Sequence, residues 1–142
     1  MNQSVRLSLA EILLAQRLAL VSLLVREYDE AIRFYVEKLG FELVEDRLLG
    51  GEKRWVRIAP PRGHGTQILL ARAANANQSS RVGNQTVVRV FLFVETDDFD
   101  GDYDAMLGRG VEFTEPPRDE AYGRVAVFKD LYGNRIDLIQ PA

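Results

Sequence analysis

The stretch that decides the fold lies near the end of the chain and reads Tyr132-Gly133-Asn134-Arg135-Ile136-Asp137-Leu138-Ile139. Its Gly-Asn pair tolerates positive φ and predicts a tight turn. Apolar and polar residues then alternate, so Ile136 and Leu138 would share one face of a strand and Asp137 would lie on the other. The end of the chain is therefore predicted to be a turn followed by a half-buried strand.

A fainter copy of this stretch occurs 68 positions earlier, as Gly65-Thr66-Gln67-Ile68-Leu69-Leu70, with Leu69 in the place of Asp137. A second pair of landmarks, Gly40-Phe41-Glu42 and Gly110-Val111-Glu112, lies 70 positions apart. Agreement of several landmarks at nearly one offset indicates an internal repeat.

Each half is predicted to run strand, helix, strand, strand, strand. Runs of apolar residues or period-two alternation mark the strands, and apolar residues at helical spacing mark the helices, which end at Gly40 and Gly110. The clearest strands are residues 18–25, 41–48, 54–59, 67–72, 87–95 and 123–129, together with the final stretch.

This order predicts an α+β protein of two tandem βαβββ modules, residues 17–72 and 87–142, joined by a linker of residues 73–86. Pairing two such units, within a chain or between chains, would cover one sheet face with helices and leave the other as a curved sheet lining a concave cleft. Residues 1–16 are predicted to be an N-terminal helical extension, because Ser8-Leu9-Ala10-Glu11 has the form of a capping box.

Composition narrows the class of protein. The 142 residues are 46% hydrophobic and 27% charged, which suits one domain, and the net charge of −3 gives no reason to expect nucleic acid or anionic membranes as partners. Cysteine is absent, so disulfides and zinc–sulfur sites are excluded, and the longest apolar runs are too short to cross a membrane. We expect a cytoplasmic protein.

The first strand, Leu20-Val21-Ser22-Leu23-Leu24-Val25, the helix end at Leu39-Gly40-Phe41 and the ending from Asp130 to Leu138 together resemble one known group. This is the glyoxalase/bleomycin-resistance/extradiol-dioxygenase superfamily, also called vicinal oxygen chelate proteins, and the resemblance covers residues 16–142. It implies paired βαβββ modules, a cleft on the concave sheet face and frequently a dimer. In the metal enzymes of the family, His or Glu side chains from the first and last strand of each module hold a divalent ion.

Carried over by position, those four ligand sites fall on Leu20, on Leu69, on Arg89 or Phe91, and on Asp137. Three of them cannot bind a metal, and one carboxylate leaves an ion nearly as hydrated as in water. We therefore expect no metal and no cofactor, unless Glu45, Glu95 or His64 reaches the cleft.

Arg89, Phe91 and Phe93 alternate along one strand, so they are expected to form one wall of the cleft, suited to a flat or partly aromatic anionic ligand. Asp137 would face the same cleft, as a partner for a cationic or hydroxylated ligand or as a general base, and it is the best candidate for a catalytic residue. The alternative for Asp137 is a salt bridge to Arg135 or Arg89.

Further candidates lie on other elements. Trp55 and Arg57 form a similar pair, although a single tryptophan also suits a core or an interface. Tyr122 and Arg124 flank a glycine that permits close approach of a ligand, or they belong to an ordinary turn. His64 is either a base on a lid over the cleft or an exposed loop residue.

These observations predict a metal-free protein that binds a small organic molecule in the cleft, as the resemblance to bleomycin-resistance proteins implies, and that forms a homodimer. One alternative is a divalent-metal-dependent lyase, isomerase or dioxygenase of the glyoxalase type. Another is a dimeric interaction module whose aromatic wall is covered by a second subunit and holds no ligand.

Overall fold

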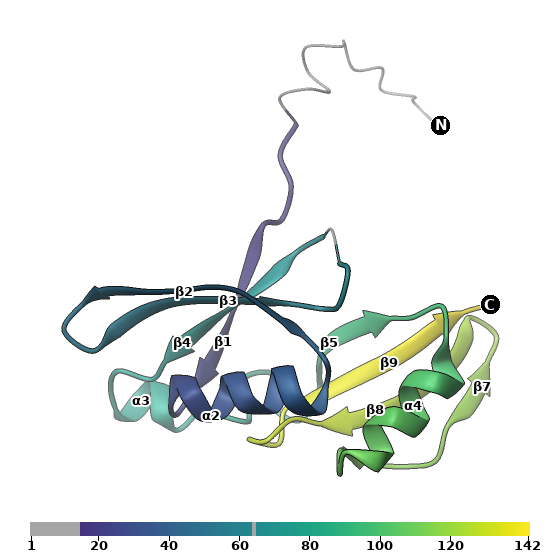
Figure 1. The fold of residues 1–142 in the computed structure, drawn as a ribbon. Coiled ribbons are helices and arrows are strands. Elements are labelled where there is room, and N and C mark those ends of the chain that lie inside the picture. Colours follow the sequence, from purple (N-terminus) through teal and green to yellow (C-terminus); the bar gives the residue numbers. More distant parts are fainter. Residues whose placement is uncertain (1–14, 64) are drawn as a thin grey trace, which may run out of the picture.

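The computed structural model describes residues 15–63 and 65–142, and it contains two mixed β-sheets with helices beside them (Figure 1). The first sheet has the strand order β1-β4-β3-β2, and the second has the order β5-β9-β8-β6 with β7 paired to β8. The elements of the first half are β1 (Leu20–Val25), α2 (Tyr28–Arg33), the π-helical turn η1 (Phe34–Lys38), β2 (Glu42–Gly50), β3 (Lys53–Ala59) and β4 (Gln67–Arg72). After α3 (Ala76–Ser79) come β5 (Val90–Glu95), α4 (Phe99–Gly108), β6 (Glu112–Phe113), β7 (Arg118–Glu120), β8 (Gly123–Lys129) and β9 (Arg135–Pro141).

The two halves repeat one topology. In each sheet the first strand pairs in parallel with the last strand of its half, β1 with β4 and β5 with β9, and the remaining pairs are antiparallel. Gly40 and Gly110 follow the helices with φ of 77° and 86°, as the sequence predicts. The α+β class and the repeated strand order are thus confirmed.

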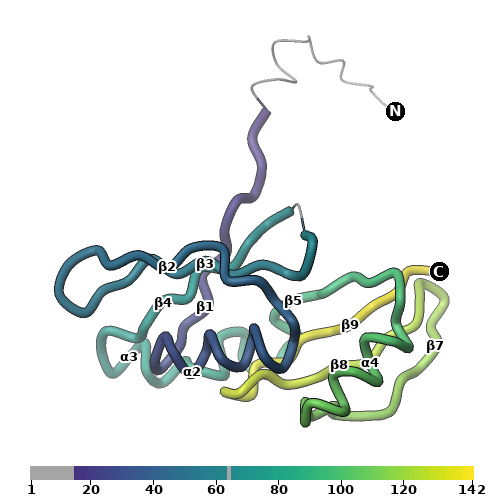
Figure 2. Tube along the Cα trace, viewed as in Figure 1, coloured from purple at the N-terminus to yellow at the C-terminus, as the bar shows by residue number. Residues whose placement is uncertain are grey.

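The sheets are separate but share one core. No strand pairing joins them within residues 15–63 and 65–142, so the strands form two sheets rather than one curved sheet. Leu23, Tyr35 and Phe41 of the first half belong to the same buried cluster as Phe128 and Ile136 of the second. Figure 2 shows the α2–η1 segment extending from the first sheet toward the second.

The turn between β8 and β9 is held together by hydrogen bonds to the side chain of Asp130. Asp130 is buried, and its carboxylate accepts hydrogen bonds from the backbone N–H groups of Tyr132 and Asn134 and from the Asn134 side chain, each at 2.9 Å. The Tyr35 hydroxyl, from the other half, donates to the same carboxylate at 2.7 Å. A buried charge needs several such partners, and here they join the turn to the η1 segment.

The linker closes the outer edge of β1. The backbone N–H of Leu24 donates to Gln85 Oε1, and Gln85 Nε2 donates to the carbonyl of Ser22, both at 2.9 Å. One side-chain amide thereby replaces a neighbouring strand on this edge. Gly83 holds the linker close to the β8–β9 turn, since a Cβ there would lie 2.0 Å from the carbonyl oxygen of Tyr132.

Several expectations differ from the structure. The linker was expected to be irregular, but it contains α3, whose first turn is capped because the Asn75 side chain accepts from the N–H of Gln78 at 2.9 Å. The strand expected from residue 87 begins at Val90, because Val87 and Val88 have φ of 53° and 70° and are not extended. The strand β7 was not predicted. Of the expected N-terminal helix, residues 1–14 lie outside the described part of the chain, as does His64.

The described residues include no helix that is long and apolar enough to cross a membrane.

Candidate ligand-binding faces

In each sheet the side chains of one face are buried with the helices in the core, and we call the other face the open face. In the first sheet, Val56, Ile58 and Leu70 are buried beneath the helices. Successive strand residues point to opposite sides. The side chains that share the first open face are therefore Ser22, Leu24, Glu45, Arg47, Trp55, Arg57, Leu69 and Ala71.

Arg57 is held in place on this face by its neighbours. Its Nε donates to Glu45 Oε1 at 2.9 Å, and its Nη1 bonds the side-chain oxygen of Gln67. These bonds link β2, β3 and β4 across the sheet. Arg57 thus lies on the first open face, where part of its hydrogen-bonding capacity is already used by the protein.

Trp55 lies one row further along the first open face. It lines a cavity of about 660 Å³ at the end of the sheet, whose other open-face residues are Leu69 and Ala71. The remaining lining residues are the polar or charged Glu52, Lys53, Arg54, Arg72 and Gln78, together with Tyr28, Leu49, Leu70, Ala73 and Ala74. An apolar floor with a few polar groups is the usual composition of a site for a small organic molecule.

On the second sheet, Phe93 and Asp137 lie side by side as register partners in β5 and β9, and Val127 of β8 lies on the other side of Asp137. These residues define the second open face. Phe93 is 67% exposed, whereas Asp137 is only 5% exposed. The structure therefore brings together an exposed aromatic ring and a buried carboxylate, two of the residues predicted for the site.

Among the residues that the structure describes, Asp137 forms no ion pair. Its Oδ1 is buried and bonds nothing among the residues that the structure describes. Burial raises the pKa of Asp137, Arg118 opposes this shift, and Glu115 adds to it. Arg118 itself pairs with two other carboxylates, those of Glu115 and, at 2.6 Å, Glu120.

The single wall expected from Arg89, Phe91 and Phe93 is wrong. The register of β5 shifts between Val90 and Leu92, so Phe91 lies at an irregularity and packs against the core cluster. Arg89 is exposed and precedes the strand. Only Phe93 of the three is an exposed ring beside Asp137, and the salt bridge to Arg135 or Arg89 is not found within residues 15–63 and 65–142.

Arg124 lies on the opposite side of the second sheet. Its guanidinium is 5.3 Å from the ring centre of Phe99 at the start of α4 and pairs with Asp119 at 3.1 Å and Asp100 at 3.5 Å. Tyr122 is exposed in the turn before β8. The structure therefore does not bring Arg124 to the open face with Asp137.

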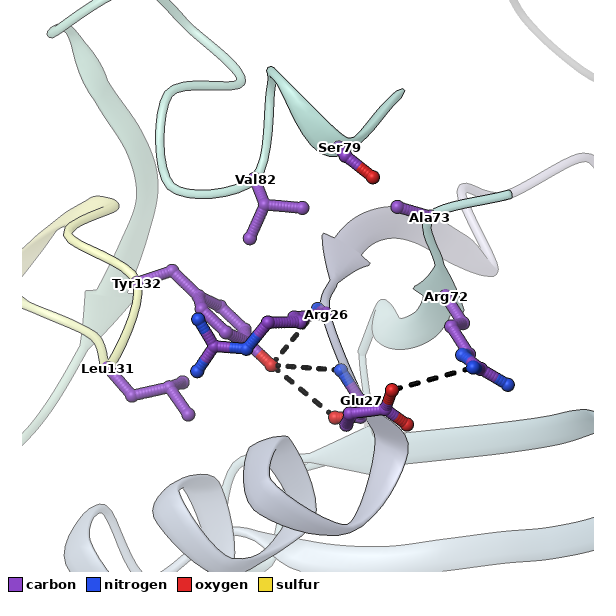
Figure 3. A pocket seen from close by; sticks show the side chains of 8 residues that line it. All are labelled: Arg26, Glu27, Arg72, Ala73, Ser79, Val82, Leu131 and Tyr132. Atoms are coloured by element: carbon purple, nitrogen blue, oxygen red, sulfur yellow. Dashed lines mark hydrogen bonds and ion pairs between the residues drawn. The ribbon is translucent and has the colours of Figure 1, made fainter. Parts of the chain in front are cut away.

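A further cavity, of about 530 Å³, lies where β1, the linker and the β8–β9 turn meet (Figure 3). Its polar groups satisfy one another: Arg72 pairs with Glu27 at 3.4 Å, and the Tyr132 hydroxyl accepts from the N–H of Arg26 at 3.1 Å and donates to Glu30 at 2.6 Å. Burial and the bond to Glu30 raise the pKa of Tyr132 to about 12. These mutual pairs indicate a junction between the halves rather than a ligand site.

The donors around Asp137 do not fit a divalent ion. Its neighbours across the sheet, Phe93 and Val127, carry no ligand atom, and the described residues include no cluster of three or more His, Cys, Asp or Glu side chains able to hold a metal. A metal ion needs several converging oxygen or nitrogen ligands.

Sequence reasoning missed the surroundings of both predicted sites. Glu115 and Arg118 reach Asp137 from the segment before β8, and Gln67 and Glu45 bond Arg57 across the first sheet. Such neighbours depend on the strand register, which one sequence does not reveal. The alternation that placed Asp137 and Arg57 on strand faces was the only available signal.

Comparison with known sequences identifies one superfamily and several relatives. Residues 17–138 match the sequence model of the Glyoxalase/Bleomycin resistance protein/Dioxygenase superfamily. An uncharacterized protein of Shewanella frigidimarina is 50% identical over 126 residues, which are 88% of this chain and 93% of that protein. The protein YetH of Bacillus subtilis is 29% identical over 119 residues, 84% of this chain and 93% of YetH.

Solved structures share the fold. TnmS3, described as an antibiotic binding protein from Streptomyces sp. CB03234, is 34% identical with a TM-score of 0.75, over 90% of this chain and 98% of TnmS3. A superfamily member from Sphaerobacter thermophilus is 29% identical with a TM-score of 0.74, over 89% of this chain and 98% of that chain.

Proposed function

Because the chain belongs to the Glyoxalase/Bleomycin resistance protein/Dioxygenase superfamily, we propose that it binds a small organic molecule on its open sheet faces without a metal ion. One observation carries this proposal: Asp137 lies beside Phe93 and Val127, which offer apolar area, and the described residues include no cluster of three or more His, Cys, Asp or Glu side chains that could hold a metal there. Shape, stacking and a single polar contact suffice for binding, whereas the metal-dependent chemistry of the family needs a converging ligand set.

One similar solved structure supports the proposal that the chain binds a small organic molecule. TnmS3, which shares 34% identity, is described as an antibiotic binding protein. In this chain, Phe93 is exposed and Trp55 is half-buried, and these two side chains supply aromatic area on the two open faces.

We further propose that the binding site is completed by a second copy of the chain. The buried core cluster takes residues from both halves of the chain, and no strand pairing joins the two sheets within residues 15–63 and 65–142. An open face that meets the open face of another subunit would form a cleft with two walls. Phe93, a large apolar side chain that is 67% exposed on the second open face of the single chain, fits an interface of this kind.

The proposed location is the cytoplasm, which the absence of cysteine from the sequence favours.

A neutral aromatic probe, 1-naphthalenemethanol, tests metal-free binding. The full chain is treated with EDTA, and binding is followed by ligand-observed NMR with and without added Mn²⁺. We expect saturable binding that the chelator leaves unchanged, and a loss of about fivefold in affinity for Phe93→Ser, since an aromatic contact contributes about 1 kcal/mol. Leu107→Ser removes an exposed apolar side chain from α4 and should leave binding unchanged.

Failure to see saturable binding, or binding that needs Mn²⁺, would contradict the proposal. The second result would instead favour a metal-dependent lyase, isomerase or dioxygenase.

A further inference from the structure

The carboxylate of Asp137 is buried on the second open face, and one of its oxygens lacks a partner among the residues that the structure describes. Its Oδ1 is bonded to nothing within the described part of the chain, and the residue is 5% exposed. A buried polar atom left without a hydrogen bond is unfavourable, so such an atom on an open face marks a place where a ligand would complete the structure.

The charged groups around Asp137 determine whether a ligand at this place should be a cation or an anion. Arg118, the nearby cation, is shared by Glu115 and Glu120, so this group together with Asp137 has three carboxylates and one guanidinium. Of these charged groups only Asp137 is buried, and electrostatic interactions with a buried charge are less weakened by water than those with the exposed Glu115, Arg118 and Glu120. An anion would be repelled here and a cation attracted.

Phe93 indicates the chemistry of the part of the ligand that does not contact the carboxylate. Its ring is 67% exposed and lies next to Asp137 in the neighbouring strand. An aromatic face attracts a cation and also stacks on flat apolar groups. Arg89, the positive side chain that the sequence predicts beside Phe91 and Phe93, precedes β5. It is therefore not paired with Asp137 across the strands, as Phe93 is.

We infer that the bound molecule is an organic cation, a flat or aromatic compound whose ammonium or guanidinium group donates a hydrogen bond to Asp137 while its apolar part packs on Phe93. This inference rests on the binding function proposed above and adds the class of ligand.

Three probes that share one ring system separate the charge from the apolar contact. These are 1-naphthylmethylamine, cationic at pH 7, the neutral 1-naphthalenemethanol and the anionic 1-naphthoate. By calorimetric titration of the full chain at low salt, we expect the amine to bind at least tenfold more tightly than the alcohol, and the naphthoate to bind most weakly. Raising the salt concentration should weaken the binding of the amine and leave the binding of the alcohol unchanged.

Asp137→Asn keeps the shape of the side chain and removes its charge, so it should reduce the preference for the amine over the alcohol to less than about threefold. Glu112→Gln removes one carboxylate from the same sheet, where it pairs with Lys129 at 3.5 Å, and should leave the preference intact.

Equal binding of the amine and the alcohol to the unmodified chain, or a preference that survives Asp137→Asn, would overturn the inference and leave the proposed function standing. Absence of binding by all three probes would overturn the proposed function itself. The salt dependence of the unmodified chain decides the question even if the Asn variant does not fold.

Discussion

Asp137 is kept in an environment that opposes its charge. Because its pKa is raised in the folded chain, mainly by burial, the protonated form is the one that the fold favours. The favourable contribution is therefore fully present below the unfolded pKa, about 3.9 for an aspartate, and is lost as the pH rises through the folded pKa. At neutral pH the ionised carboxylate should reduce the stability of the ligand-free protein.

We predict that Asp137→Asn raises the melting temperature at pH 7 and that the difference from the unmodified chain disappears near pH 3. Thermal unfolding followed by circular dichroism at both pH values measures this. Asp104→Asn, at an exposed position on α4, serves as the control and should change little. A melting temperature of Asp137→Asn at or below that of the unmodified chain at pH 7 would show that the carboxylate is stabilised by contacts that the structure does not contain.

The sequence was sufficient to select Asp137 but not its neighbours. Strand alternation placed this residue opposite Ile136 and Leu138, which are both buried in the core. The identity of the adjacent aromatic residue depended on the register shift in β5, which made Phe93, and not Phe91, the partner of Asp137. A register shift is a property of the paired strands and leaves no pattern in one of them.

Among the elements, β1 depends on the linker more than its apolar composition indicates. Gln85 closes its outer edge with two hydrogen bonds of 2.9 Å to Leu24 and Ser22. The sequence predicted a structureless linker because its polar residues show no period, and a single side chain that bonds a distant backbone produces no period either.

We predict that Gln85→Ala lowers the free energy of unfolding by about 1–3 kcal/mol, because two backbone groups of β1 lose their partner. Urea unfolding followed by the fluorescence of Trp55, the one tryptophan of the chain, reports the change. Gln16→Ala, at an exposed position before β1, should leave stability within about 0.5 kcal/mol. Equal stability of both variants would mean that water replaces the amide without cost.

Other element boundaries show how local preference and tertiary structure compete. Gly40 and Gly110 end their helices as predicted, because positive φ is a local requirement that glycine satisfies. Val87 and Val88 favour strands by their branched side chains, yet both have positive φ and lie before β5. Their conformation is set by the linker, where the N–H of Val88 donates to the Asn84 side chain at 2.9 Å.

For the whole molecule, the internal repeat predicted two modules with one strand order, and the two sheets reproduce that order. How the modules pack was not readable from the sequence, because it depends on contacts such as the bond between Tyr35 and Asp130 that join residues far apart in the chain. The residues of one buried cluster come from both modules. The site that we propose belongs to two subunits, each of which supplies an open face.

A crystal structure of the full chain grown with both 1-naphthylmethylamine and Mn²⁺ tests this account most directly. We predict a dimer in which the naphthalene ring lies between Phe93 of one subunit and the open face of the other that carries Trp55, with the amine within hydrogen-bonding distance of Asp137. No anomalous scattering from manganese should appear at that carboxylate. A manganese ion coordinated by Asp137, or a ring bound away from both open faces, would contradict the account.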